Sequence, residues 1–186
     1  MALQETDPGS ELYAEGANVD RVIGYMGAMA GEICSEEAVS ADGEVNAART
    51  AAEIDPRLIA FMLPGIPGSV PVARFHIRAA LVFQGLGQLA DDAAIIVSEL
   101  VTNAVQHACR EITTTIGVTL ARTEDPGTLI IAVSDCSPHT PMMRIARPGS
   151  ERGRGLQIVE SLAVHWGWHR EPRGKAVFAI LAAEGA

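Results

Sequence analysis

Two short runs of β-branched and aliphatic residues, 112–120 and 129–133, place the strongest limit on how this chain can fold. The first run is rich in Thr, Ile and Val, and the second is wholly apolar. Between them, Glu124-Asp125-Pro126-Gly127 has the composition of a turn, because Asp, Pro and Gly each favour turn conformations of the backbone. The two runs therefore predict an antiparallel β-hairpin.

Periodic apolar residues predict helices on both sides of this hairpin. In residues 69–85 they recur at helical spacing, with Ser69 placed to cap the helix and Pro71 in its first turn. Residues 91–108 form a longer periodic segment that begins with two aspartates, which are favourable at a helix N-terminus. A third helix is predicted over 153–163.

Three further strands complete the predicted domain. They span residues 58–63, before a Pro-Gly cluster, and residues 164–170 and 175–181 near the end of the chain. The resulting order is β-α-α-β-β-loop-α-β-β. This order predicts an α/β fold of the α+β two-layer type, in which about three helices cover one face of a mixed, mostly antiparallel sheet.

The net charge of −9 lies in one part of the chain. Residues 1–56 hold 12 Asp and Glu against 2 Arg, a balance of −10, whereas residues 57–186 hold 11 acidic and 12 basic residues, a balance of +1. We interpret 1–56 as an acidic, flexible N-terminal extension and 57–186 as the folded domain. The acidic extension repels phosphate backbones and argues against direct nucleic-acid binding.

The length of 186 residues excludes a large multidomain enzyme. No run approaches the roughly 18 to 20 apolar residues that span a bilayer, and the acidic start does not resemble a secretion signal. We therefore expect a cytoplasmic protein without membrane contact. The three cysteines are widely spaced and match no zinc pattern, so we expect reduced thiols.

Three small clusters of residues could carry chemistry. Glu99 and Asn103 are four residues apart and share one face of the second predicted helix. Asp135 follows the apolar strand of the hairpin, and Gly153 and Gly155 begin the third helix, where free N–H groups favour phosphate. Each cluster has an ordinary alternative: a solvated helix face, a turn residue and a common glycine pattern.

Taken together, the clusters resemble the motifs of a known superfamily. Residues 98–108, 133–135 and 153–159 are similar to the N, G1 and G2 boxes of the GHKL, or Bergerat-fold, ATPases, which include gyrase and the histidine kinases. Within this superfamily, Trp166-Gly167 followed by residues 174–178, Gly-Lys-Ala-Val-Phe, most resembles the single-domain anti-sigma-factor serine/threonine kinases and related actinobacterial regulatory proteins. The resemblance covers about residues 57–182 and implies a histidine-kinase-like ATPase domain with ATP and Mg²⁺ as cofactors.

The resemblance also implies roles for individual residues. Asn103 would bind the Mg²⁺ that bridges the phosphates, Glu99 would act as general base, and Asp135 would accept a hydrogen bond from the adenine amine. His107 matches a histidine that recurs at the end of the N box. A capping or core role is the alternative for His107.

The phosphates would be bound around the start of the third helix. There the resemblance implies contacts from Gly153, Gly155 and the backbone near Leu156. The preceding segment corresponds to the ATP lid, and Arg152 and Arg154 at its end could contact the triphosphate.

The chain departs from the family pattern at two places. The G1 box usually continues Asp-x-Gly-x-Gly, whereas residues 135–139 are Asp-Cys-Ser-Pro-His. In the family a Thr or Ser near the last strand often assists the adenine-binding Asp, and we expect Ala176 to occupy that place.

The leading functional hypothesis is an anti-sigma-factor serine/threonine kinase that binds a sigma factor and phosphorylates an STAS-type anti-anti-sigma partner. The alternative is a non-catalytic, ATP-dependent binding module that controls a transcription regulator. A fragment of a sensor histidine kinase is disfavoured, because its only candidate phosphoacceptor, His76, lacks the expected neighbours. The resemblance also suggests a homodimer.

Overall fold

The computed structural model describes residues 57–107, 114–123, 125–141, 153–171 and 174–183. The elements follow the predicted order, with bounds that differ from the predicted ones by a few residues. They are β1 (Leu58–Pro64), α2 (Ser69–Phe83), a short 3-10 turn (Gly87–Leu89), α3 (Ala90–His107), β2 (Thr115–Arg122), β3 (Thr128–Asp135), α4 (Gly155–Leu162), β4 (His165–Glu171) and β5 (Gly174–Ala182). Among the helices that the structure describes, none is long and apolar enough to cross a membrane.

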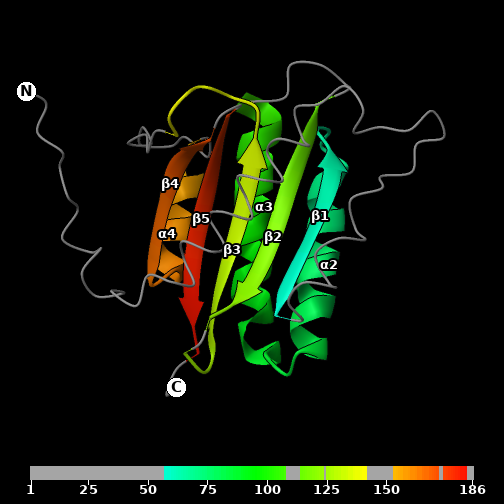
Figure 1. Ribbon diagram of the computed structural model, residues 1–186, viewed down its shortest axis with the longest axis vertical. Coiled ribbons are helices and arrows are strands. Elements are labelled where there is room, and N and C mark those ends of the chain that lie inside the picture. Colours follow the sequence, from blue (N-terminus) through cyan, green and yellow to red (C-terminus); the bar gives the residue numbers. More distant parts are fainter. Residues whose placement is uncertain (1–56, 108–113, 124, 142–152, 172–173, 184–186) are drawn as a thin grey trace, which may run out of the picture.

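The five strands form one open sheet in the order β1-β2-β3-β5-β4, and α2, α3 and α4 all cover one of its faces (Figure 1). This confirms the predicted α+β two-layer class. The predicted hairpin is β2 and β3, paired with Val118 opposite Val133.

All four strand pairings are antiparallel, so the prediction of a mixed sheet is wrong. The reason is the route of the chain after β3. The connection through α4 carries the chain past its neighbouring position to the edge strand β4, and β5 then returns into the gap beside β3. A parallel pair would require a crossover into the adjacent position, which this route avoids.

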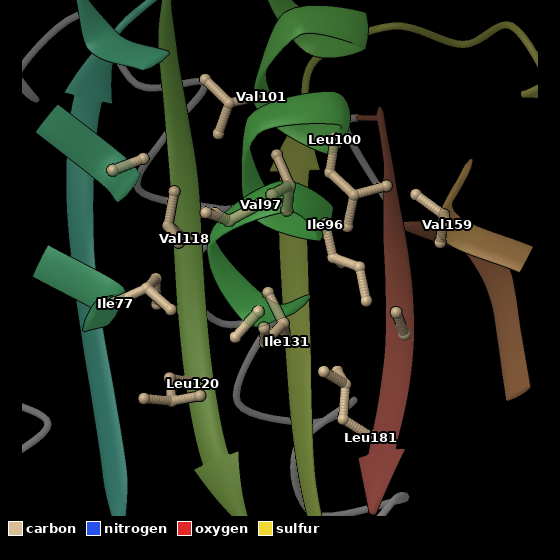
Figure 2. Close-up of a cluster of buried hydrophobic side chains, with 14 of the residues drawn as sticks. Ile77, Ile96, Val97, Leu100, Val101, Val118, Leu120, Ile131, Val159 and Leu181 are labelled. Atoms are coloured by element: carbon tan, nitrogen blue, oxygen red, sulfur yellow. The ribbon is translucent and has the colours of Figure 1, made fainter. Parts of the chain in front are cut away.

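The main core lies between the sheet and α3. Ile96, Val97 and Val101 on α3 are fully buried and meet Val118 and Ile131 from the central strands (Figure 2). Each such side chain contributes about 1.5–3 kcal/mol through burial. Helix α3 also contacts α2 on one side and α4 on the other, so it is the central element of the helical layer.

A second, smaller apolar cluster involves the alternate residues of the same strands. Ile130 and Ala132 on β3 and Ala176 and Ile180 on β5 belong to it, and all four are at most 3% exposed. Because successive side chains of a strand point to opposite faces, residues 129, 131 and 133 face the helices and residues 130 and 132 face away. Burial on both faces explains why this strand has no polar alternation.

Helix α2 begins differently from the predicted arrangement. Gly68 is the N-cap residue, and no side chain caps the helix. Ser69 is instead the first helical residue, and its hydroxyl donates a 2.6 Å hydrogen bond to the carbonyl oxygen of Pro64 at the end of β1. This bond ties the start of α2 to the edge strand.

The buried face of α2 is not its most hydrophobic one. Ser69, Ala73, Ile77 and Leu81 are buried against the sheet and α3. Several apolar residues that predict the helix by their spacing lie on the exposed side, namely Val72, Phe75, Val82 and Phe83. The periodicity therefore identifies the helix correctly but does not identify the side that the core covers.

Two neighbouring substitutions on α2 test this assignment. Leu81→Ala removes a side chain that is 0% exposed, and we expect a loss of about 2–5 kcal/mol in the free energy of unfolding. Val82→Ala is the matched control, because Val82 is 67% exposed, and we expect a change within about 0.5 kcal/mol. Urea unfolding followed by circular dichroism measures both. Equal losses in the two variants would contradict the assigned helix face.

Candidate functional site

The contact between α3 and the start of α4 brings together three of the residues singled out in the sequence. Glu99 and Asn103 lie one helical turn apart on α3 and are partly buried, and Gly155 is the first residue of α4. A Cβ atom placed on Gly155 would lie 2.7 Å from Glu99 Oε2 and 3.5 Å from both Asn103 Oδ1 and Asn103 Nδ2. A side chain at 155 would therefore displace the end of the Glu99 side chain and contact the Asn103 amide, whereas glycine leaves this space open.

The start of α4 has the features of an anion-binding helix terminus. Arg154 is its N-cap residue, and no side chain accepts a capping hydrogen bond there. Gly153 has a φ of 88°, in the left-handed region that favours glycine. The first N–H groups of a helix have no partner within the helix and point outward from its end, so an anion can bind there.

The other residues predicted to contact the phosphates differ in their exposure to solvent. Gly153 and Arg154 are exposed beside the helix start. The side chain of Leu156 is 7% exposed and belongs to the main core, so only its backbone could contact a ligand. Arg152 lies outside the residues that the structure describes.

Asp135 is the last residue of β3, and it is buried beside Lys175, a residue outside the predicted site. Lys175 is its direct cross-strand partner on β5. The distance between Lys175 Nζ and Asp135 Oδ1 is 2.6 Å, and the two side chains are 8% and 4% exposed. The backbone N–H of Ser137 donates a second hydrogen bond of 2.8 Å to the same Oδ1 atom.

Burial raises the pKa of Asp135 above its ordinary value. The hydrogen bond and charge of Lys175, the N–H of Ser137 and the charge of His107 each act in the opposite direction and lower this pKa, but they do not cancel the effect of burial. His107 is the last residue of α3 and is exposed, so the end of this helix lies within electrostatic range of the carboxylate.

The backbone around Asp135 is also tightly arranged. A Cβ atom on Gly174 would overlap the carbonyl oxygen of Asp135, so the strand pair can approach only because residue 174 is glycine. Ser137 is buried, and its hydroxyl oxygen accepts a 3.2 Å hydrogen bond from the N–H of His139. These contacts order the segment after Asp135 without the glycines of the family pattern.

Two sequence-based expectations about this segment are wrong. Ala176 does not occupy the place beside Asp135: it pairs with Ser134 and lies in the second apolar cluster, on the face away from the helices. Lys175 shares the face of Asp135, because the two are cross-strand partners. Cys136 takes part in a disulfide bond, whereas the cysteine spacing predicts reduced thiols.

The site thus has two ends, arranged along α3. The carboxylate of Glu99 and the amide of Asn103 face the start of α4, and His107 near the Asp135–Lys175 pair is eight residues after Glu99. At 1.5 Å per residue, this is a separation of about 12 Å along the helix axis. One end combines a carboxylate, an amide and a helix N-terminus, and the other end holds a buried ion pair.

Comparison with known proteins identifies the family. The model of the histidine kinase-like ATPase domain matches residues 64–181, which is more than half of the chain. The chain belongs to the histidine kinase-like ATPase domain family. Members of this family are ATP-binding, kinase-like ATPases, which agrees with the superfamily that the motifs resemble.

A solved structure with similarity to this ATPase domain is the histidine kinase domain from the blue-light activated histidine kinase of Erythrobacter litoralis EL346. The two are 19% identical, with a TM-score of 0.38, and the match covers 64% of this chain and 61% of that chain. The match therefore spans less than two thirds of that solved chain. No curated protein matches this chain.

Gly155→Ala tests the contact between α3 and α4. The added methyl group would fill the space beside the Asn103 amide, where Mg²⁺ and the phosphates would bind, and would push the Glu99 carboxylate aside, so we expect ATP binding in the presence of Mg²⁺ to weaken by about tenfold or more, equivalent to about 1.4 kcal/mol. The control is Gly68→Ala, where the nearest side-chain atom would be 3.9 Å from the new Cβ. Isothermal titration calorimetry measures both affinities, and unchanged binding in Gly155→Ala would contradict the proposed crowding.

A double-mutant cycle tests the energetic role of the Asp135–Lys175 pair. Each of Asp135→Asn and Lys175→Met leaves one buried group without its ionic partner, and we expect losses of about 3–5 kcal/mol in unfolding free energy. The double variant should lose less than the sum, with a coupling above about 1 kcal/mol. The exposed pair of Arg78 and Asp91 is the control, with an expected coupling of about 0.2–1 kcal/mol. Additive losses at 135 and 175 would show that the two groups do not stabilise one another.

Proposed function

We propose that this ATPase domain is an anti-sigma-factor serine/threonine kinase, which binds a sigma factor and phosphorylates an STAS-type anti-anti-sigma partner. The observation that carries the proposal is the approach of the Glu99 carboxylate and the Asn103 amide to Gly155 at the start of α4. This arrangement supplies a proton acceptor, a hard oxygen ligand and backbone donors for phosphate within one small region.

The residues at this end fit a magnesium ion. The amide oxygen of Asn103 is the type of hard ligand that Mg²⁺ prefers, and the missing side chain at Gly155 leaves space beside it. When bound, Mg²⁺ neutralises charge on the phosphate oxygens. Asn103 would hold the ion, while the first turn of α4 binds the phosphates.

Glu99 would act on the acceptor hydroxyl. In the proposed step, the serine or threonine oxygen of the partner forms a bond to the γ-phosphorus as the bond from that phosphorus to the β–γ bridging oxygen breaks and ADP leaves. The proton of the hydroxyl goes to Glu99 Oε. A carboxylate one helical turn from Asn103 would lie near an acceptor hydroxyl that approaches the phosphate end of the site.

Asp135 would bind the adenine amine at the other end of the site. The Asp135 carboxylate is buried and accepts a hydrogen bond from the N–H of Ser137, so it is held in a fixed position as a hydrogen-bond acceptor. The charge of His107 would act on the Asp135 carboxylate at this end of the site. Arg152 and Arg154 are proposed contacts of the triphosphate.

The resemblance extends the proposal to a homodimer that acts in the cytoplasm, where a sigma factor is found. The acidic segment 1–56, which lies outside the described residues, would adjust the affinity for the protein partner. Deletion of residues 1–56 followed by a measurement of partner affinity tests this role.

Glu99→Gln tests the catalytic part of the proposal. The amide keeps the size of the side chain but cannot accept the proton, so we expect phosphotransfer to fall by about 10²–10⁴-fold. The dissociation constant for ATP should stay within about threefold, because Glu99 is not a proposed ligand of the nucleotide. The assay combines calorimetry with transfer of labelled phosphate to a panel of purified STAS-domain proteins.

Glu160→Gln is the matched control for this experiment. Glu160 is an exposed carboxylate on α4, so its substitution should alter neither binding nor transfer. Undiminished transfer in Glu99→Gln would remove Glu99 from the mechanism. Tight ATP binding by the wild type with no transfer to any panel member would favour the non-catalytic binding module.

A further inference from the structure

We propose that Lys175 is a nucleobase-binding residue, which donates a hydrogen bond to the N1 atom of adenine while Asp135 accepts one from the N6 amine. This inference deepens the proposed ATP site and rests on it. Lys175 would occupy the place beside Asp135 that the family resemblance predicts for Ala176.

The first support is the position of Lys175 on the sheet. Because Lys175 pairs directly with Asp135 across antiparallel strands, the two side chains leave the sheet on the same face, toward the helices. Ala176 leaves on the other face. Lys175 is thus the β5 side chain that lies next to the Asp135 carboxylate.

The second support is the chemistry of the pair. The relevant edge of adenine has a donor, the N6 amine, beside an acceptor, the ring atom N1. Both described contacts of the Asp135 carboxylate are made by Oδ1, so Oδ2 is the oxygen that would accept the amine. The ammonium group of Lys175 has three N–H donors, and its bond to Oδ1 uses one of them, so it can bind N1 while it stays paired.

The third support is the rarity of lysine in this chain. Lys175 is the single lysine beside 13 arginines. Its side chain is 8% exposed, although lysine is seldom buried and a buried ion pair by itself is weak evidence for stability. A ligand-binding role accounts for a compact ammonium group in this place, since an arginine fork would need more space.

Nucleotide analogues test the inference in the unaltered protein. In 1-deaza-ATP, N1 is replaced by a CH group while the amine remains, so the Lys175 donor would face carbon. We expect calorimetry to show binding about tenfold weaker than for ATP. The matched control is 7-deaza-ATP, which keeps N1 and N6 and should bind within about threefold of ATP.

The single lysine allows a direct spectroscopic readout. Protein labelled with [ζ-¹⁵N]lysine gives one side-chain ammonium signal, and we expect this signal to shift on addition of ATP and of 7-deaza-ATP. Addition of 1-deaza-ATP at saturation should leave the signal near its ligand-free position. This measurement requires no substitution and so does not depend on the stability of a variant.

Substitution of Lys175 completes the test. Lys175→Met should bind ATP and 1-deaza-ATP with affinities within about twofold of each other, because the donor to N1 is gone, and circular dichroism confirms that the variant is folded. Equal affinity of the wild type for ATP and 1-deaza-ATP, or tighter ATP binding by Lys175→Met, would overturn the inference while leaving ATP binding established. Failure of the wild type to bind ATP would instead overturn the proposed function.

Discussion

The packing of α3 against the sheet is the interaction on which the rest of this structure depends. Its buried stripe, which includes Ile96, Val97 and Val101, fixes the rotation of the helix about its own axis. With this rotation, the side chains of Glu99 and Asn103 lie beside Gly155 at the start of α4. The apolar core therefore positions Glu99 and Asn103 at this end of the site.

The alternation of side chains along β3 and β5 sets the other end of the site. On both strands the apolar residues continue on both faces, and charged residues enter the helix-facing row only at its end, at Asp135 and Lys175. A shift of one residue in this register would exchange Lys175 for Ala176 and place the ammonium group on the far face. The close approach of Gly174 to the Asp135 carbonyl helps to exclude such a shift.

Much of the fold could be predicted from the sequence because the elements are short, periodic and separated by clear turns. The order of elements and the β2–β3 hairpin depend on local patterns of this kind, whereas the joint site of Glu99, Asn103 and Gly155 was implied only by the resemblance of the motifs to the family. The exposed side of α2 could not be predicted, because Phe75 and Val82 have the same spacing as a buried stripe. Nor could the all-antiparallel pairing, which depends on where β5 enters the sheet.

Lys175 shows why one part of the site could not be found from local sequence patterns. A lysine at the start of an apolar strand looks like an ordinary edge residue until the register with β3 is known, although its uniqueness in the chain was an available signal. The next residue, Ala176, fits the motif position by its place in the sequence, but its side chain lies on the face of the sheet opposite to Asp135. Successive side chains of a strand point to opposite faces, so a motif residue on a strand can be assigned to a face only when its cross-strand partner is known.

Two different features of the fold position the two ends of the site. Helix packing places Glu99 and Asn103, whereas strand register places Asp135 and Lys175, and α3 links the ends over about 12 Å. With the proposed roles, a change at 175 would therefore alter nucleobase binding without displacing the Glu99 carboxylate and the Asn103 amide at the proposed phosphate end. Base recognition and phosphate chemistry can vary separately in such a domain, provided that the core of α3 is kept.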